Sequence, residues 1–96
     1  MKMENWPFDQ PSNCAVVTVK AIIYGELPIL YVSHEEDDYG WQFLHDNPVS
    51  MGDVSVVALR EILELDPSIL KLADLPAGRV ATRRSVRSEW ERKTRT

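Results

Sequence analysis

Cysteine occurs once in this sequence, as Cys14, so no disulfide can form within the chain. A single thiol is typical of a reducing compartment, and we expect the protein in the cytoplasm. The four glycines all stand alone, which excludes the glycine-rich loops that bind phosphates. No apolar run approaches the roughly 20 residues of a membrane-spanning helix. Residues 1–10 also lack the apolar stretch of a secretory signal, so we expect no membrane partner.

Motifs with a known chemistry are missing as well: there is no G-x-S-x-G, H-E-x-x-H or paired C-x-x-C. The two histidines, His34 and His45, resemble an acid/base pair or part of a metal site when taken with Asp46, but no third ligand matches them. Surface histidines at strand ends are the plainer interpretation, and Cys14 is expected to be an inert thiol. We therefore expect no catalysis, metal or cofactor, and keep an enzyme that uses both imidazoles as a lesser hypothesis.

What is present is an ordinary globular composition: 96 residues, of which 44% are hydrophobic and 27% charged. This predicts one domain over residues 1–96. Residues 1–13 are expected to form an irregular arm whose Trp6 and Phe8 fold back onto the body, because leaving both exposed would waste apolar burial. Residues 94–96 are expected to fray.

The first half of the chain predicts a central β-hairpin. Residues 14–19 (CAVVTV) are β-branched and apolar on both faces, which is typical of an interior strand covered on each side. A short helical turn should follow over residues 20–25. Residues 29–33 (ILYVS) and 41–44 (WQFL) then form the hairpin, joined by the charged loop 34–40.

The second half predicts most of the helices. Residues 54–58 read as a strand leading into a helix from Leu59, with one continuous helical stripe as the alternative. Asp66 suits a helix N-cap before Pro67. The other expected elements are a helix over 67–73, an edge strand over 79–84 and a last helix over 86–93. The pattern predicts an α+β fold: a small, mostly antiparallel sheet with a central β-hairpin and short helices concentrated in the C-terminal half.

Charge is distributed unevenly along the chain, whose net charge is −4. Residues 1–53 carry two basic and nine acidic side chains, whereas residues 54–96 carry nine basic and six acidic ones. The acidic excess peaks in the loop at Glu35, Glu36 and the two aspartates that follow. Consecutive carboxylates diverge and lack the alternate spacing of a calcium loop, so a solvated loop is favoured over a cation site.

The basic C-terminal segment, residues 79–96, supports an alternative function as a nucleic-acid-binding accessory protein. Phosphate contacts and base stacking would come from Arg83, Arg84, Arg87, Trp90 and Arg92. The acidic isoelectric point, about 5.1, argues against this alternative, because nucleic-acid binders are usually basic.

Several phrases together resemble a small bacterial family of unknown function related to immunity protein 33-like, toxin-immunity domains. The phrases lie at residues 6–8 (WPF), 28–34 (PILYVSH), 41–44 (WQFL), 56–59 (VVAL), 66–68 (DPS) and 75–78 (LPAG). None is a catalytic signature. The resemblance implies a bacterial, non-enzymatic domain, with relatives proposed to neutralise toxins, and it carries over no functional residues.

These observations favour a protein-binding domain, and the resemblance implies an immunity-protein-like role for it. An acidic surface speeds encounter with a basic protein partner, such as a toxin. The expected contacts are Glu35, Glu36, Asp37, Asp38 and Asp46, with Tyr39 and Trp41 as aromatic anchors. A homodimer built on unpaired strand edges is a further alternative.

Overall fold

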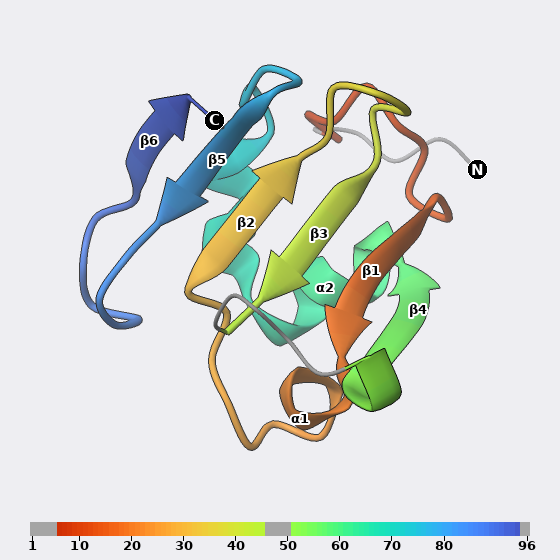
Figure 1. Cartoon of the computed structure of the whole chain (residues 1–96), viewed down its shortest axis with the longest axis vertical. Helices are drawn as coiled ribbons and strands as arrows, with labels where there is room; N and C mark the ends of the chain where they lie inside the picture. Colours follow the sequence, from red (N-terminus) through yellow and green to blue (C-terminus); the bar gives the residue numbers. More distant parts are fainter. Residues whose placement is uncertain (1–5, 46–50, 95–96) are drawn as a thin grey trace.

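A mixed six-stranded sheet with short helices on one face forms the body of the protein, a broadly α+β arrangement (Figure 1). The computed structural model describes residues 6–45 and 51–94. The strands are β1 (Ala15–Val19), β2 (Tyr31–His34), β3 (Trp41–Leu44), β4 (Val54–Ala58), β5 (Arg79–Thr82) and β6 (Glu91–Thr94). The helices are α1 (Lys20–Ile23) and α2 (Leu59–Leu65), with 3-10 turns η1 (Met51–Asp53) and η2 (Pro67–Leu72).

The sheet has the order β4-β1-β3-β2-β5-β6, so the predicted β2–β3 hairpin lies at its centre. Within the hairpin His34 lies opposite Trp41, and Tyr31 lies opposite Leu44. The pairs β1–β4, β2–β3, β2–β5 and β5–β6 are antiparallel, whereas β1 runs parallel to β3. The loop between β2 and β3 therefore lies at one end of the sheet, and α1 at the other (Figure 1).

Local hydrogen bonds explain the junctions between β4, α2 and η2. The Glu61 carboxylate accepts from the Ala58 backbone N–H at 2.9 Å, which caps α2 where the strand ends. The Asp66 side chain accepts from the Ser68 N–H at 3.0 Å, and Pro67 occupies the first turn of η2. The predicted strand-to-helix change at Leu59 and the predicted cap at Asp66 are both confirmed.

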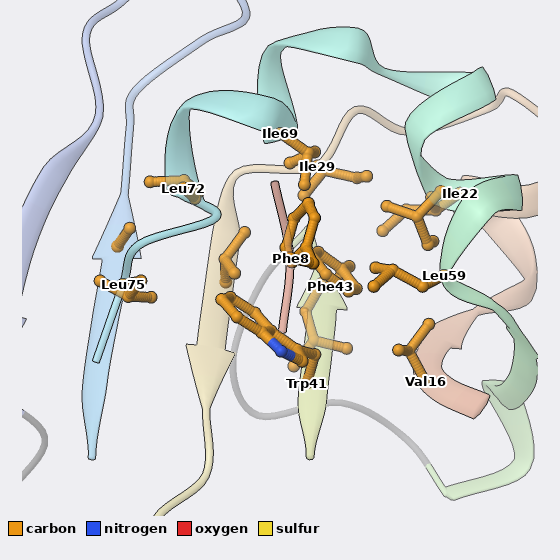
Figure 2. Close-up of a cluster of buried hydrophobic side chains, with 14 of the residues drawn as sticks. Phe8, Val16, Ile22, Ile29, Trp41, Phe43, Leu59, Ile69, Leu72 and Leu75 are labelled. Atoms are coloured by element: carbon orange, nitrogen blue, oxygen red, sulfur yellow. The ribbon is translucent and has the colours of Figure 1, made fainter. Parts of the chain in front are cut away.

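The core lies between the sheet and the layer formed by α2 and η2. Phe8 reaches into it from the N-terminal arm, and its ring meets the edge of Trp41 with the centroids 5.3 Å apart (Figure 2). Trp41 in turn stacks on Phe43 at 5.9 Å. Phe8 is buried and Trp6 packs against the core, so the prediction that the arm folds back is confirmed.

Two predictions for the C-terminal segment are wrong. Residues 86–93 do not form a helix, because turns lead instead into β6, whose four residues pair with β5. Consequently β5 is not an edge strand, since it lies between β2 and β6. The spacing of Val86 and Trp90 resembles a helical stripe, but tertiary pairing overrides this local preference.

The expectation that the first strand is covered on both faces is also wrong. β1 is interior within the sheet, yet helices α2 and η2 lie on one face only (Figure 1). Val16 and Thr18 point to that face and are buried, whereas burial on the opposite face is partial: Ala15 is exposed, Val17 is half-buried, and Val19, next to α1, is buried. No helix within residues 6–45 and 51–94 combines the length and apolar character needed to cross a bilayer.

Candidate functional site

The acidic loop between β2 and β3 is the first candidate site, and only part of it faces solvent freely. Glu36, Asp37 and Asp38 are exposed, whereas Glu35 is half-buried and accepts from the Ser33 hydroxyl. The Asp38 Oδ1 accepts from the Gly40 N–H at 2.9 Å, which fixes the turn. The loop thus presents its charge from a defined backbone rather than from a loose segment.

Tyr39 places an aromatic ring beside these carboxylates. It is 63% exposed, and its φ of 58° lies in the left-handed region that non-glycine residues rarely adopt. Its carbonyl accepts from the Gln10 side-chain amide at 3.4 Å, which connects the loop to the N-terminal arm. A strained backbone that holds an aromatic side chain in solvent is a feature typical of binding sites.

A cavity of about 450 Å³ lies next to Tyr39. Its lining comes from the arm, the hairpin and the segment after η2: Asp9, Gln10, His34, Tyr39, Ala73, Asp74, Leu75, Pro76 and Ala77. The two residues of this lining that carry full charge, Asp9 and Asp74, are both acidic and exposed. The loop and the cavity adjoin at Tyr39, so exposed carboxylates of the loop lie beside a concave surface.

His34 is not the surface histidine that the sequence predicted. It is only 9% exposed, and its ring stacks on Trp41 with the centroids 4.0 Å apart. Its Nδ1 lies 2.7 Å from the Leu75 carbonyl, which can only accept, so Nδ1 carries the hydrogen. The buried Nε2 meets no hydrogen-bond partner among the described residues.

The two histidines do not converge. His34 lies opposite Trp41 at the loop end of the hairpin, whereas His45 follows β3 at the other end, about 13 Å away by the rise of a strand. The His45 Nδ1 contacts the Pro28 carbonyl at 3.0 Å. The structure therefore does not bring together the acid/base pair that an enzyme using both imidazoles requires.

The two remaining predicted contacts of a protein partner are Trp41 and Asp46. Trp41 is 2% exposed, and its indole N–H donates to the Gln10 side chain at 3.1 Å. Its ring belongs to the core, which corrects the expectation that it anchors a partner, because a core ring has no surface to offer. Asp46 lies outside the described residues.

Arg83, expected to contact nucleic acid, instead points into the protein. Its side chain is 2% exposed and forms an ion pair with Asp66 at 2.6 Å. Its guanidinium also donates to the Ile29 carbonyl, at 3.0 and 2.8 Å, and lies 4.2 Å from the centre of the Trp90 ring. This burial corrects the sequence-based role, because neither Arg83 nor the ring face it covers is available to a phosphate or a base.

The other basic residues predicted to contact nucleic acid, Arg84, Arg87 and Arg92, differ in their surroundings. Arg84 and Arg87 are exposed. The Arg92 guanidinium donates to Asp74 at 2.6 Å and to the Lys71 carbonyl at 3.0 Å. That hydrogen bond, together with the positive charge of Arg92, holds the pKa of Asp74 below its ordinary value.

Sequence reasoning missed the contributions of Asp9, Gln10 and Asp74 to the lining of the cavity beside Tyr39. No local signal marks them, because they come from segments that read as an irregular arm and a turn. Among the described residues no group of histidine, cysteine, aspartate and glutamate side chains is arranged to hold a metal ion.

Comparison with known proteins yields no relative: no family model matches the chain, and neither a curated protein nor a solved structure matches it.

Proposed function

We propose that this protein is a non-enzymatic, bacterial protein-binding domain of the cytoplasm that captures a basic protein partner. The proposed contact surface, here called the acidic face, consists of Glu36, Asp37, Asp38, Tyr39 and the adjoining cavity. The observation that carries the proposal is Tyr39, held 63% exposed on a left-handed backbone between these carboxylates and the cavity.

The chemistry of the acidic face supports a cationic ligand group. A lysine or arginine side chain entering the cavity would meet Asp9 and the Tyr39 ring, while the exposed carboxylates of the loop lie beside the entrance, next to Tyr39 in the sequence. The charge of the loop would accelerate encounter, while the ring would supply the apolar contact that slows dissociation. The resemblance to immunity protein 33-like domains suggests a toxin as such a partner.

The test is an association measurement with the product of the neighbouring gene, or with a protein recovered from the native organism by pull-down. The double variant Glu36→Lys, Asp37→Lys should slow association strongly at 20 mM salt and much less at 200 mM, because screening removes long-range attraction. A separate Tyr39→Ser variant should speed dissociation.

A charge-matched control is Asp53→Lys, Glu89→Lys, which changes the net charge equally but alters exposed residues outside the acidic face. If both double variants slow association to the same degree, the partner senses only net charge, and the acidic face is not the interface. Unchanged association in all variants would reject the proposal altogether.

A further inference from the structure

A second surface, at the α1 end of the molecule, combines exposed apolar side chains with concave shape. One hollow of about 380 Å³ lies between the segment after α1, the end of α2 and Val86. A second, of about 220 Å³, lies between α1, β4 and α2, and the two share Leu65. Leu27, Leu65 and Val86 line the first hollow and are 39%, 45% and 59% exposed. These three residues and the two hollows are called the apolar groove below.

The charged residues that line the apolar groove are all acidic, as far as the structure describes the chain: Glu26, Glu61, Glu64 and Asp66. Two of these carboxylates are already engaged, since Glu61 caps α2 and Asp66 pairs with Arg83. Within residues 6–45 and 51–94, no ion pair or hydrogen bond is found for the side chains of Glu26 and Glu64. The groove therefore offers an apolar floor with free negative charge on its rim.

The floor of the groove is rigidly supported. Arg83 donates to the Ile29 carbonyl and to Asp66, both from residues of the lining, and to the Ser68 hydroxyl at 3.0 Å. The side chains of Ile22 and Ile29 that close the hollow are buried in the core. A preformed groove binds without the entropic cost of ordering its own walls.

We infer that the apolar groove is a docking site for a basic amphipathic helical segment of a protein partner. Such a segment places large apolar side chains on one face and lysine or arginine beside them, which matches an apolar floor with a carboxylate rim. The site differs from the acidic face, because it lies at the opposite end of β2 from the acidic loop (Figure 1). The inference also goes beyond the proposed function, because here the apolar side chains of the partner would be the main contacts by which it is recognised.

The probe is a synthetic helical peptide of leucine and lysine, with leucine recurring every three or four positions. Titrated into the isotope-labelled protein, it should shift the backbone amide signals around Leu27, Leu65 and Val86. Leu65→Ser should weaken binding about tenfold, because the lost side chain no longer buries apolar area against the peptide. The double variant Glu26→Lys, Glu64→Lys should also weaken binding, and it should do so more at low salt than at high salt.

The matched control is Leu70→Ser, because Leu70 is also 45% exposed but does not line the groove. It should leave the dissociation constant unchanged, as should the Glu36→Lys, Asp37→Lys variant of the acidic face. A peptide with glutamate in place of lysine should bind far more weakly. The inference would be overturned if the peptide did not bind, or if Leu65→Ser and Leu70→Ser weakened binding equally. Equal affinity for the glutamate peptide would also overturn it. None of these outcomes bears on the acidic face.

Discussion

At the scale of single residues, Arg83 connects segments that are distant in the sequence. Its guanidinium joins the Ile29 carbonyl before β2, the Asp66 carboxylate before η2 and the Trp90 ring before β6. A planar group with five N–H donors suits this task, whereas lysine would satisfy only part of it. Burial of the charge is tolerable because these partners occupy the donors.

Arg83→Ala should lower the free energy of unfolding by about 3–5 kcal/mol, because Asp66 loses its ion-pair partner and the Ile29 carbonyl loses both guanidinium hydrogen bonds. Urea denaturation measures the change. Arg84→Ala is the matched control: its side chain is exposed, and its effect should stay within about 0.5 kcal/mol. Similar losses for the two variants would contradict the role assigned to Arg83.

Tyr39 is the residue where stability and binding are expected to conflict. Tyr39→Gly should raise the free energy of unfolding by about 1 kcal/mol, since glycine adopts a φ of 58° without strain. The same change removes the exposed ring and should weaken capture of the partner. Thermal denaturation and binding measured on the same sample test both effects, and a destabilised Tyr39→Gly variant would refute the strain argument.

At the scale of elements, local signals predicted the first two-thirds of the chain well. The hairpin, the strand before Leu59 and the cap at Asp66 each rest on neighbours in the sequence, and the structure contains all of them. β6 could not be predicted in this way, because residues 91–94 are polar and exposed and become a strand only by pairing with β5. The spacing of apolar residues within this segment gives no information about a partner strand.

The candidate site was predictable only in part for the same reason. The carboxylates of the acidic loop adjoin one another in the sequence and stand out as a charge cluster. Their neighbours in space, Asp9 and Asp74, come from distant segments that only the folded chain brings to one cavity. Charge alone likewise did not distinguish Arg83, which is buried, from Arg84, which is exposed.

Docking of β6 is expected to depend on pH through Asp74. Arg92 lowers the pKa of this carboxyl in the folded state, so the pair stabilises the fold above the ordinary aspartate pKa of about 4. The contribution is lost as the pH falls through the lowered pKa. In an NMR titration the Asp74 carboxyl should titrate below about pH 4. Arg92→Ala should return it to the ordinary value, and an unchanged titration would exclude the pair.

At the scale of the whole molecule, the two edges of the sheet differ in character. β6 carries Glu91, Arg92 and Lys93, and such charges discourage pairing with other chains. β4, at the other edge, has the sequence VSVVA without charge or proline, and its Val56 is 62% exposed. The notion of a homodimer built on a strand edge therefore concerns β4 rather than β6.

Val56→Lys should reduce any concentration-dependent association of the protein, because a charge on β4 opposes the addition of another strand. Light scattering over a concentration series measures the mass. Leu70→Lys is the control, since it adds the same charge to an exposed apolar residue outside the sheet. Equal effects of the two substitutions would indicate general charge repulsion rather than strand pairing.

The position of β5 in the sheet has a consequence during synthesis. Because β5 pairs with β2 and is itself flanked by β6, strand β2 gains its second neighbour only after the chain has been synthesised through Thr82. Until then the nascent hairpin exposes an unpaired strand, and the Ile29 carbonyl lacks its guanidinium. The sheet therefore cannot be completed before β6 has been synthesised, and chaperones have that interval in which to engage the nascent chain.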